Sequence, residues 1–455
     1  MQLTGKPGCT ILKLEHTQNM EIGKNYIMKN TQKLILLILS ILIILSILIF
    51  AWWRWNTELL AKKPYQTEQE EVAYYIERHF LLDYSVTAES LLNQYGTITE
   101  IVQSLHDPYS ELLLKEELDQ AVLELNGNYV GVGFEAKKHK GEYLQIIGVM
   151  PDSPAMKSGL KPNDIILTID EMDTKSMDSA QTLSHIKGPE GTVVSLAIRR
   201  ENTTFEVQLQ RAQINVPIVE YRMLSETCGY ISLTQLPMMI HQEVENALHN
   251  LSAQGMNTLV LDLRGNSGGE IEEAAMVASL MLSEDHKELF TVSHKTKEPT
   301  VYERTRKQLF SGPMYVLVNE YTASSAELLA EILRDIGDAL IVGTRTFGKG
   351  ISQSFFYLES GHILKLTTGQ FYAPSGHIIH KNGVTPDYDV PMDPRLASIG
   401  RINMSKEKQL KYVEQLRPYF IESYGEQEGI TQLEKGDIQL RTAMELVFSQ
   451  NDIIS

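Results

Sequence analysis

The hydrophobic pattern of the chain begins with one long apolar run. Residues 34–53, LILLILSILIILSILIFAWW, carry no charge. Twenty helical residues rise about 30 Å, the thickness of the hydrocarbon core of a bilayer. No small-residue cleavage site follows, so the run predicts an uncleaved transmembrane helix. The Lys-bearing flank, residues 1–33, is typical of a signal-anchor, and we expect it in the cytoplasm with the rest of the chain outside. Met28 is an alternative start to Met1.

Two segments of different periodicity follow the apolar run. Residues 54–127 carry apolar side chains at helical spacing, among them Val72, Ile76 and Phe80, which predicts several amphipathic helices. From residue 128 to 212, short β-rich runs such as DIILTID and TVVSLAIRR alternate with Gly, Pro, Asn and Asp turns. This second pattern predicts a small β-rich domain.

The pattern changes again at residue 213, to strands that alternate with helices. GYISL, TLVLDL and MYVLV are separated by helical stretches that include Glu270–Leu282 and Ala326–Ile336. This alternation predicts a mostly parallel α/β core over residues 213–395, because parallel strands need crossover helices. Residues 396–455 are charged and helical in pattern. The fold class is therefore α/β and multidomain, with helical segments before and after the core.

Composition excludes several classes of protein. The 455 residues include 41 Lys and Arg against 58 Asp and Glu, a net charge of −17, whereas a nonspecific nucleic-acid binder needs a basic face. Cys9 and Cys228 are the only cysteines, too few for a disulfide framework or a cysteine metal cluster. The histidines form no H-E-x-x-H motif, and His377 and His380 fit strand or turn positions. We expect no metal, no cofactor and no nucleic-acid partner.

The first of three glycine-marked segments is GNSGG at 265–269, between an apolar strand and a helix. Three interpretations are open for this segment. It matches a nucleophile elbow in which Ser267 would attack a substrate. It also fits a loop whose backbone amides converge on an anion, including a developing oxyanion. Finally, it could be a tight turn that needs positive φ.

The other two segments bring together a hydroxyl group and a lysine. NEYTASSAE at 319–327 lies between a strand and a helix, and Ser324 and Glu327 have capping-box spacing. TFGKG at 346–350 holds a lysine between glycines, with Gln353 nearby. A helix cap and a solvated loop are the ordinary interpretations. Alternatively, a lysine that burial has deprotonated can act as the base for a serine nucleophile, which makes these segments a candidate Ser-Lys dyad.

These segments together resemble the carboxy-terminal processing protease family. The resemblance includes the 25-residue step from Ser324 to Lys349, YAPSGHII and GVTPD within 372–387, and LHDPYS at 105–110. It implies a Ser-Lys dyad with Ser324 as nucleophile and Lys349 as general base. The other implied roles are Gln353 as the group that orients the lysine and Gly268, Gly269 and Ser325 as the oxyanion-hole region. Ser267 then becomes a turn residue, and Ser325 is the alternative nucleophile if the register is shifted by one.

The resemblance also assigns a PDZ domain to residues 128–212, on the strings YVGVGF and PDSPAMKSGLKPNDIILTID. It implies that Gly131, Val132, Gly133 and Phe134 bind the terminal carboxylate of unfolded or disordered protein tails. The implied function is a tail-specific, membrane-anchored serine endopeptidase. An inactive, membrane-tethered PDZ scaffold is the alternative. One departure is Thr322, where the family often has serine.

The surroundings of the protein are predicted more coarsely. The apolar run would place residues 34–53 in a lipid bilayer, which makes this a single-pass protein of a cell membrane. The catalytic domain would be extracytoplasmic, and the arrangement is typical of bacteria. The helical ends, about 66–124 and 400–455, would either mediate a homodimer or pack on the chain's own core, because amphipathic helices must bury their apolar face.

Overall fold

The computed structural model describes residues 44–47, 49–50, 63–138, 141–150, 152–393, 396–397, 416–417, 420–421 and 423–454. The chain divides into two compact units, Met1–Thr67 and Glu68–Ser455. Within the first unit, residues 44–47 and 49–50 are helical and exposed. The rest of the predicted transmembrane segment 34–53, like Cys9, lies outside the described residues. No helix among the residues that were described is both long and apolar enough to cross a bilayer.

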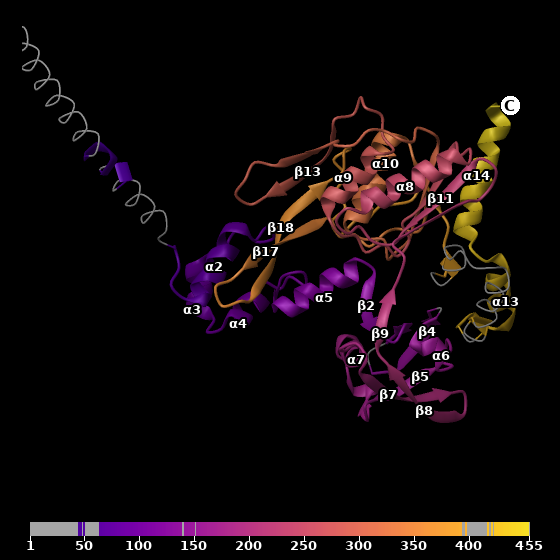
Figure 1. Cartoon of the computed structure of the whole chain (residues 1–455), viewed down its shortest axis with the longest axis horizontal. Coiled ribbons are helices and arrows are strands. Elements are labelled where there is room, and N and C mark those ends of the chain that lie inside the picture. Colours follow the sequence, from indigo (N-terminus) through magenta and orange to yellow (C-terminus); the bar gives the residue numbers. More distant parts are fainter. Residues whose placement is uncertain are drawn as a thin grey trace, which may run out of the picture. The chain divides into compact units, whose positions relative to one another are not determined.

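The second unit begins with a helical segment, as the apolar spacing predicted (Figure 1). Its helices are α2 (Glu68–His79), α3 (Ala88–Gln94), α4 (Ile98–Gln103) and α5 (Lys115–Leu125). Thr87 and Thr97 cap α3 and α4 by accepting the amides of Ser90 and Glu100. Val72, Ile76 and Phe80 are buried in one cluster with Leu364 and Leu366, which belong to β18 (Ile363–Tyr372). These helices therefore pack on the chain's own core.

A β-rich domain follows, as predicted. Strands β2 (Asn128–Gly131) and β9 (Ala212–Asn215) pair antiparallel, so the two ends of the domain lie side by side. Between them lies a sheet in the order β3-β4-β5-β7-β8, with β6 paired to β5. The strands are β3 (Phe134–Lys137), β4 (Leu144–Val149), β5 (Ile165–Ile169), β6 (Met172–Asp173), β7 (Val193–Arg200) and β8 (Thr203–Gln210), with helices α6 (Pro154–Lys157) and α7 (Ser179–Ile186). Strand β3 occupies one edge of this sheet.

The core of the second unit is the predicted α/β sheet, in the order β10-β11-β12-β15-β16-β19. Its strands are β10 (Val219–Met223), β11 (Cys228–Leu233), β12 (Thr258–Asp262), β15 (Met314–Val318), β16 (Leu340–Gly343) and β19 (Tyr388–Asp389). All neighbouring pairs are parallel except β10 with β11. Buried strands of this kind read as continuous apolar runs, which is why TLVLD and MYVLV have no polar face.

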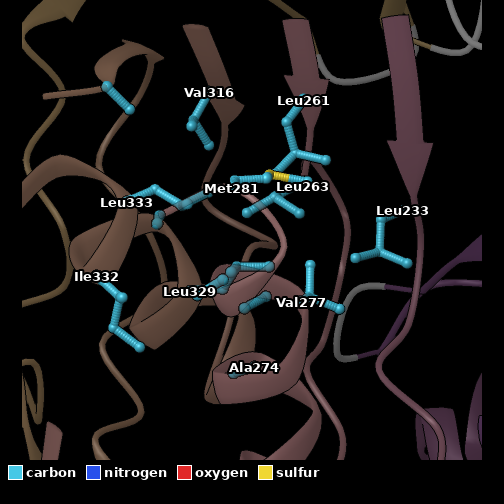
Figure 2. Close-up of a cluster of buried hydrophobic side chains, with 14 of the residues drawn as sticks. Leu233, Leu261, Leu263, Ala274, Val277, Met281, Val316, Leu329, Ile332 and Leu333 are labelled. Atoms are coloured by element: carbon cyan, nitrogen blue, oxygen red, sulfur yellow. The ribbon is translucent and has the colours of Figure 1, made fainter. Parts of the chain in front are cut away.

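Helices cover both faces of this sheet. On one face, α8 (Ile240–Ala253), α9 (Ile271–Ser279) and α10 (Ser325–Gly337) share a large apolar cluster with β11, β12 and β15. Figure 2 shows part of it, with Val277 and Leu329 between the helices and Leu261 and Val316 on the strands. On the other face, α14 (Ile438–Ile454) contributes Ala443 and Val447 to a second cluster. Burial on both faces fixes the sheet and the loops that leave its carboxyl ends.

A second sheet, which the sequence pattern did not predict, is built around β18. One edge of β18 pairs with β1 (Glu111–Leu113) and then with β13 (Glu288–His294), and the other edge pairs with β17 (Ile351–Tyr357). Strand β14 (Thr300–Glu303) continues the sheet beyond β13. The TFGKG loop runs directly into β17. The two predicted catalytic segments therefore border different sheets.

A buried ion pair holds the carboxy-terminal helix to the core. Arg264 follows β12 and is fully buried. Its guanidinium donates to both carboxylate oxygens of Asp262, at 2.9 and 2.6 Å, and of Asp437, at 2.7 and 2.8 Å. Asp437 lies two residues after the end of α13 (Glu426–Lys435) and directly precedes α14. The beginning of α14 is thus fixed at the end of β12 from which the GNSGG loop departs.

Candidate active site

Ser324 lies at the sharp turn between β15 and α10. Its backbone has φ 59° and ψ −127°, a conformation that residues with a side chain rarely adopt. Strain of this kind at a strand-to-helix turn is typical of a nucleophile elbow, which presents a hydroxyl to the substrate. Ser324 is 8% exposed, whereas neighbouring Ser325 is 0% exposed and its buried hydroxyl has no partner among the described residues. The geometry therefore distinguishes the two adjacent serines.

Lys349 lies in the loop that enters β17. Its Nζ is 4.7 Å from the centre of the Tyr109 ring. Burial, and secondarily the charge of Lys365, lowers the pKa of Lys349, while Asp107 and Glu327 oppose that shift. Burial lowers a lysine pKa because it disfavours the charged form. Lys349 is thus half-buried rather than fully solvated, and its amine is shifted toward the neutral form that a base requires.

Glu327 connects the serine turn with the lysine loop. Its fully buried carboxylate accepts the amide of Ser324 at 2.8 Å, the amide of Gly348 at 2.7 Å and the amide of Lys349 at 2.8 Å. The hydroxyl of Thr346 donates to it as well. Burial raises the pKa of Glu327, and these donors act in the opposite direction. The capping-box spacing predicted the contact with Ser324, but it gave no sign of the contacts with the lysine loop.

Gln353 is placed differently from the contact that the resemblance implied. Its Nε2 donates to Oγ1 of Thr367 at 3.3 Å, and that hydroxyl donates to Asp107 at 2.7 Å. Asp107 also accepts the hydroxyl of Ser110 at 2.6 Å. Among the hydrogen bonds of the described residues, none joins Gln353 to Lys349. Sequence reasoning missed Asp107 and Tyr109, whose one signal was their place in the LHDPYS string.

The GNSGG loop packs against the serine turn. The backbone oxygen of Asn266 accepts a hydrogen bond from the amide of Ala323 at 2.8 Å. The amide of Gly265 donates to the side-chain oxygen of Asn319, also at 2.8 Å. Gly268 has φ +97°, and a Cβ there would lie 2.8 Å from both the Ala323 oxygen and the Ser324 Cβ. Only glycine allows this approach. The predicted anion-binding loop and the predicted positive-φ turn are therefore compatible descriptions of one segment.

The backbone amides that were predicted to donate to an oxyanion differ in the hydrogen bonds that they already form. The amide of Gly268 donates to the side-chain oxygen of Asn266 at 2.8 Å and is therefore occupied in this structure. Gly269 forms an isolated parallel bridge with Leu236, which holds the loop in place. Ser325 is the first residue of α10, where backbone amides have no partner within the helix. Of the predicted three, Gly268 is thus the one whose amide is already engaged by a side chain among the described residues.

Ser267, the nucleophile of the elbow interpretation, lies on the exposed side of this loop. Its hydroxyl donates to Oε1 of Gln235 at 3.1 Å, and an amide oxygen is not a base of useful strength. Ser267 is not among the described residues with positive φ. The strained turn that an elbow requires lies at Ser324 instead.

The two histidines that the sequence analysis singled out occupy separate environments. His377 Nδ1 lies 2.8 Å from the buried carboxylate of Glu331 in α10. His380 is partly buried, and burial lowers its pKa. Within the described part of the chain, no group of three or more His, Cys, Asp and Glu side chains is arranged to hold a metal ion.

The predicted tail-binding residues lie where β2 ends and the edge strand β3 begins. Gly133 has φ +80°, and a Cβ on it would lie 2.2 Å from the Cβ of Ser153. The Gly133 oxygen accepts both the amide of Met150 at 3.0 Å and the hydroxyl of Ser153 at 3.0 Å. Phe134 then pairs with Val149 of β4. The tight turn therefore leads directly into a strand whose outer edge is available to an added peptide strand.

A strained serine at a strand-to-helix turn shares the carboxylate of Glu327 with the lysine loop and packs against a glycine loop, an arrangement that fits a hydrolase acting through serine. Comparison with known proteins specifies the class. The model of "Peptidase family S41" matches residues 227–390, and a PDZ domain model matches residues 145–200.

Relatives of known name agree with these matches. The carboxyl-terminal-processing protease of Picosynechococcus sp. is 33% identical over 70% of this chain and 77% of that protein. The carboxyl-terminal-processing protease of Synechocystis sp. is 34% identical over 64% of this chain and 70% of that protein. The solved structure of the photosystem II D1 C-terminal processing protease is 25% identical, with a TM-score of 0.54 over 73% of this chain and 95% of that one. The chain belongs to peptidase family S41, among the carboxyl-terminal-processing proteases, and is a serine-type peptidase with a PDZ domain.

Proposed function

We propose that this peptidase is a membrane-anchored endopeptidase that captures protein tails through its PDZ domain and cleaves them with a Ser324–Lys349 dyad. The observation that carries the dyad is the shared carboxylate of Glu327. It accepts the backbone amides of both Ser324 and Lys349 at 2.8 Å. One rigid, buried group therefore determines the position of the strained serine and of the lysine loop together.

The mechanism follows from the environment of each group. Neutral Lys349 Nζ removes the proton of Ser324 Oγ, which attacks the carbonyl carbon of the scissile peptide bond. The amides of Gly269 and Ser325 stabilise the negative oxygen of the tetrahedral intermediate. As the C–N bond breaks, Lys349 returns the proton to the leaving amine and an acyl-enzyme remains. Lys349 then removes a proton from water, which attacks the ester, and Ser324 regains its hydrogen when the carboxyl product leaves.

Gln353 and Asp107 act on Lys349 indirectly in this proposal. The chain of hydrogen bonds from Gln353 through Thr367 to Asp107 fixes the start of β17, the strand that follows Lys349. The negative charge of Asp107 raises the pKa of Lys349 against the larger effect of burial. Asp107 is therefore a positioning residue that also moderates how easily the lysine loses its proton.

Tail capture would occur at the turn formed by Gly131, Val132 and Gly133. A substrate tail would add to the edge strand β3 while its terminal carboxylate meets the backbone amides of the turn. Such recognition selects proteins by their carboxyl ends and favours unfolded or disordered ones, because a tail must be extended to pair as a strand. Cleavage would follow upstream of the captured end.

Membrane anchoring is supported by the sequence of residues 34–53 alone. Twenty uncharged residues are sufficient to span a bilayer, and the preceding lysine-bearing flank is typical of a signal-anchor. The proposal places the PDZ domain and the peptidase core outside the membrane. Its test is fractionation of the full chain beside a version that lacks residues 1–53. Recovery of both in the soluble fraction would contradict the anchor.

The catalytic proposal is tested with the ectodomain, residues 54–455, and a disordered reporter that ends in apolar residues. We expect Ser324→Ala and Lys349→Ala to abolish cleavage, and the matched controls Ser325→Ala and Ser267→Ala to retain it. Loss with Ser267→Ala alone would restore the elbow interpretation. Loss with Ser325→Ala and not Ser324→Ala would shift the nucleophile by one residue. Tail binding without cleavage by the unmodified ectodomain would contradict the proposal and favour the scaffold.

A further inference from the structure

A small basic cavity lies outside the residues of the active site. Its volume is about 150 Å³, and it is lined by His79, His294, Lys295, Thr296, Lys297, Ser354, Phe356 and Thr368. A water molecule takes about 30 Å³ in the liquid, so the cavity corresponds to about five waters. That space admits a small polyatomic ion but not a folded or extended peptide.

Cationic side chains reach this cavity from two distant parts of the chain. His79 ends α2, and Lys295 and Lys297 lie in the turn between β13 and β14. This local group of cationic side chains contrasts with the net charge of the whole chain, which is −17. Burial, followed by the charges of Lys297, Arg78 and Lys295, lowers the pKa of His79. The cations therefore repel one another at this position.

The carboxylates near this cluster are not among the residues that line the cavity. Asp83 and Glu77 act on Lys295 and partly oppose the effect of burial, which lowers its pKa. The carboxylate of Asp83 accepts both the amide and the hydroxyl of Ser85, at 2.8 and 2.6 Å. Lys295 itself donates to the backbone oxygen of Asp83 at 3.3 Å. The lining of the cavity therefore combines two lysines with no carboxylate, a composition that suits an anion.

Hydrogen-bond donors point to the same ligand chemistry. Ser354 Oγ and Thr368 Oγ1 lie 2.6 Å apart and share one hydrogen, which leaves a second hydroxyl hydrogen for a ligand. The ring of His79 stacks on Phe356, with centres 5.1 Å apart, which fixes its orientation. His294 forms part of the wall, because its two nitrogens already lie 3.3 Å from the Thr368 oxygen and from Thr300 Oγ1.

We propose that this cavity binds a small oxyanion of the phosphate type, either free or as a phosphate ester. Lys295 and Lys297 supply positive charge, the ring of His79 can supply an N–H donor, and the Ser354–Thr368 pair supplies a hydroxyl donor. Charge-assisted hydrogen bonds to several oxygens of one anion suit such a set of donors. Successive residues of a strand face opposite sides, so Ser354 and Thr368 lie on the face opposite to Gln353 and Thr367. The site is therefore separate from the proposed catalytic groups and does not depend on the proposed function.

The experiment is calorimetric titration of the ectodomain, residues 54–455, with inorganic phosphate and separately with glycerol 3-phosphate. Sodium chloride keeps the ionic strength constant, because nonspecific attraction is screened by salt. We expect saturable binding with a Kd of about 1 mM or below. Binding of both compounds would assign the cavity to phosphate esters as well as free phosphate, and binding of inorganic phosphate alone would restrict it to the free ion.

The variants distinguish this cavity from general surface charge. Lys297→Gln and His79→Phe should each weaken binding about tenfold or more, since the first removes a charged donor and the second removes a ring N–H donor. The phenylalanine keeps the ring contact with Phe356, and Lys297→Arg should restore binding because it keeps the charge. Lys307→Gln, at an exposed lysine of the core, is the matched control and should bind as the unmodified protein does. Absence of saturable binding, or binding that Lys297→Gln and His79→Phe leave unchanged, would overturn the proposal.

Discussion

The backbone amides of Ser324 and Lys349 donate to the same carboxylate oxygen, Oε2 of Glu327, each at 2.8 Å. The two residues are 25 positions apart and border different sheets, and one backbone hydrogen bond, from the amide of Phe347 to the oxygen of Thr322 at 3.0 Å, also joins their segments. The buried carboxylate between them joins the two residues with directional bonds. Mispositioning of a reacting group by 1 Å can cost about hundredfold in rate.

Replacing that carboxylate should therefore impair catalysis more than stability. Glu327→Gln keeps the shape of the side chain but removes its charge and one acceptor oxygen, so we expect kcat to fall by about hundredfold. Glu331→Gln is the matched control, because Glu331 is equally buried one helical turn later and bonds Arg334 and His377 instead. Steady-state kinetics on folded protein would measure both. An equal loss of kcat in the two variants would contradict the positioning role of Glu327.

The acidic limb of the pH–rate profile should move in opposite directions in two variants. In the proposed mechanism the rate requires neutral Lys349 and is lost as pH falls through the pKa of Lys349. Asp107 raises that pKa, so Asp107→Asn should lower it and move the limb to lower pH. Lys365 lowers it, so Lys365→Met should move the limb to higher pH. The measurement is kcat/KM against pH. If the acidic limbs of the two variants moved in the same direction, the assignment of Lys349 as the base would be refuted.

Gly268 is predicted to tolerate no side chain. Gly268→Ala would place a Cβ 2.8 Å from the Ala323 oxygen and the Ser324 Cβ, so the serine turn or the GNSGG loop must shift. We expect a loss of about hundredfold in kcat. Gly361→Ala is the matched control, with φ +93° but no heavy atom within 4 Å of its Cβ. It carries the same kind of backbone strain, so similar activities for the two alanine variants would exclude the steric explanation.

Arg264 is predicted to determine the stability of the core. Arg264→Met would remove the guanidinium that neutralises the carboxylates of Asp262 and Asp437, and both would stay buried. Breaking a buried ion pair in this way costs about 3–5 kcal/mol in the free energy of unfolding. Lys187→Met is the control, because its ion pair with Glu124 is exposed and such pairs contribute about 1 kcal/mol or less. Urea denaturation would compare the midpoints. A loss at Arg264 no larger than at Lys187 would show that the buried network is dispensable.

Tail recognition should depend on Gly133 and on a free carboxylate. Gly133→Ala would bring a Cβ within 2.2 Å of the Ser153 Cβ, which deforms the turn before β3. We expect a higher KM for a tailed reporter, by about tenfold, with kcat for a short internal peptide unchanged. Amidation of the reporter's carboxyl end should have the same effect on the unmodified protein.

Gly159→Ala is the matched control for tail recognition, since Gly159 has φ +77° in the same domain and open space around its Cβ. Equal KM values for free and amidated reporters would show that the terminal carboxylate is not what the domain recognises. A raised KM in the Gly159 variant as well would attribute the effect to general loosening of the domain.

Much of the fold was predictable because its signals are local. Apolar runs such as TLVLD and MYVLV predict buried strands, and the alternation with helices predicts their parallel order. The sheet around β18 was missed, because β1 and β13 pair with β18 from positions up to 254 residues away. Strand pairing over such distances leaves no periodic trace in the sequence. Asp107 was missed for the same reason, since its partner Thr367 lies 260 positions later.

The sequence by itself determined the family, the order of the segments and the chemical types at the site, because motif spacing and hydrophobic periodicity are properties of the chain alone. Tertiary structure decided which groups act on one another. In the folded chain, Ser324 has the strained backbone and Ser325 is buried. Gln353 donates a hydrogen bond to Thr367, and the amide of Gly268 donates one to Asn266. The carboxylate of Glu327 joins the serine turn to the lysine loop. Burial and hydrogen-bond geometry depend on which distant segments meet, and only the folded chain brings those segments together.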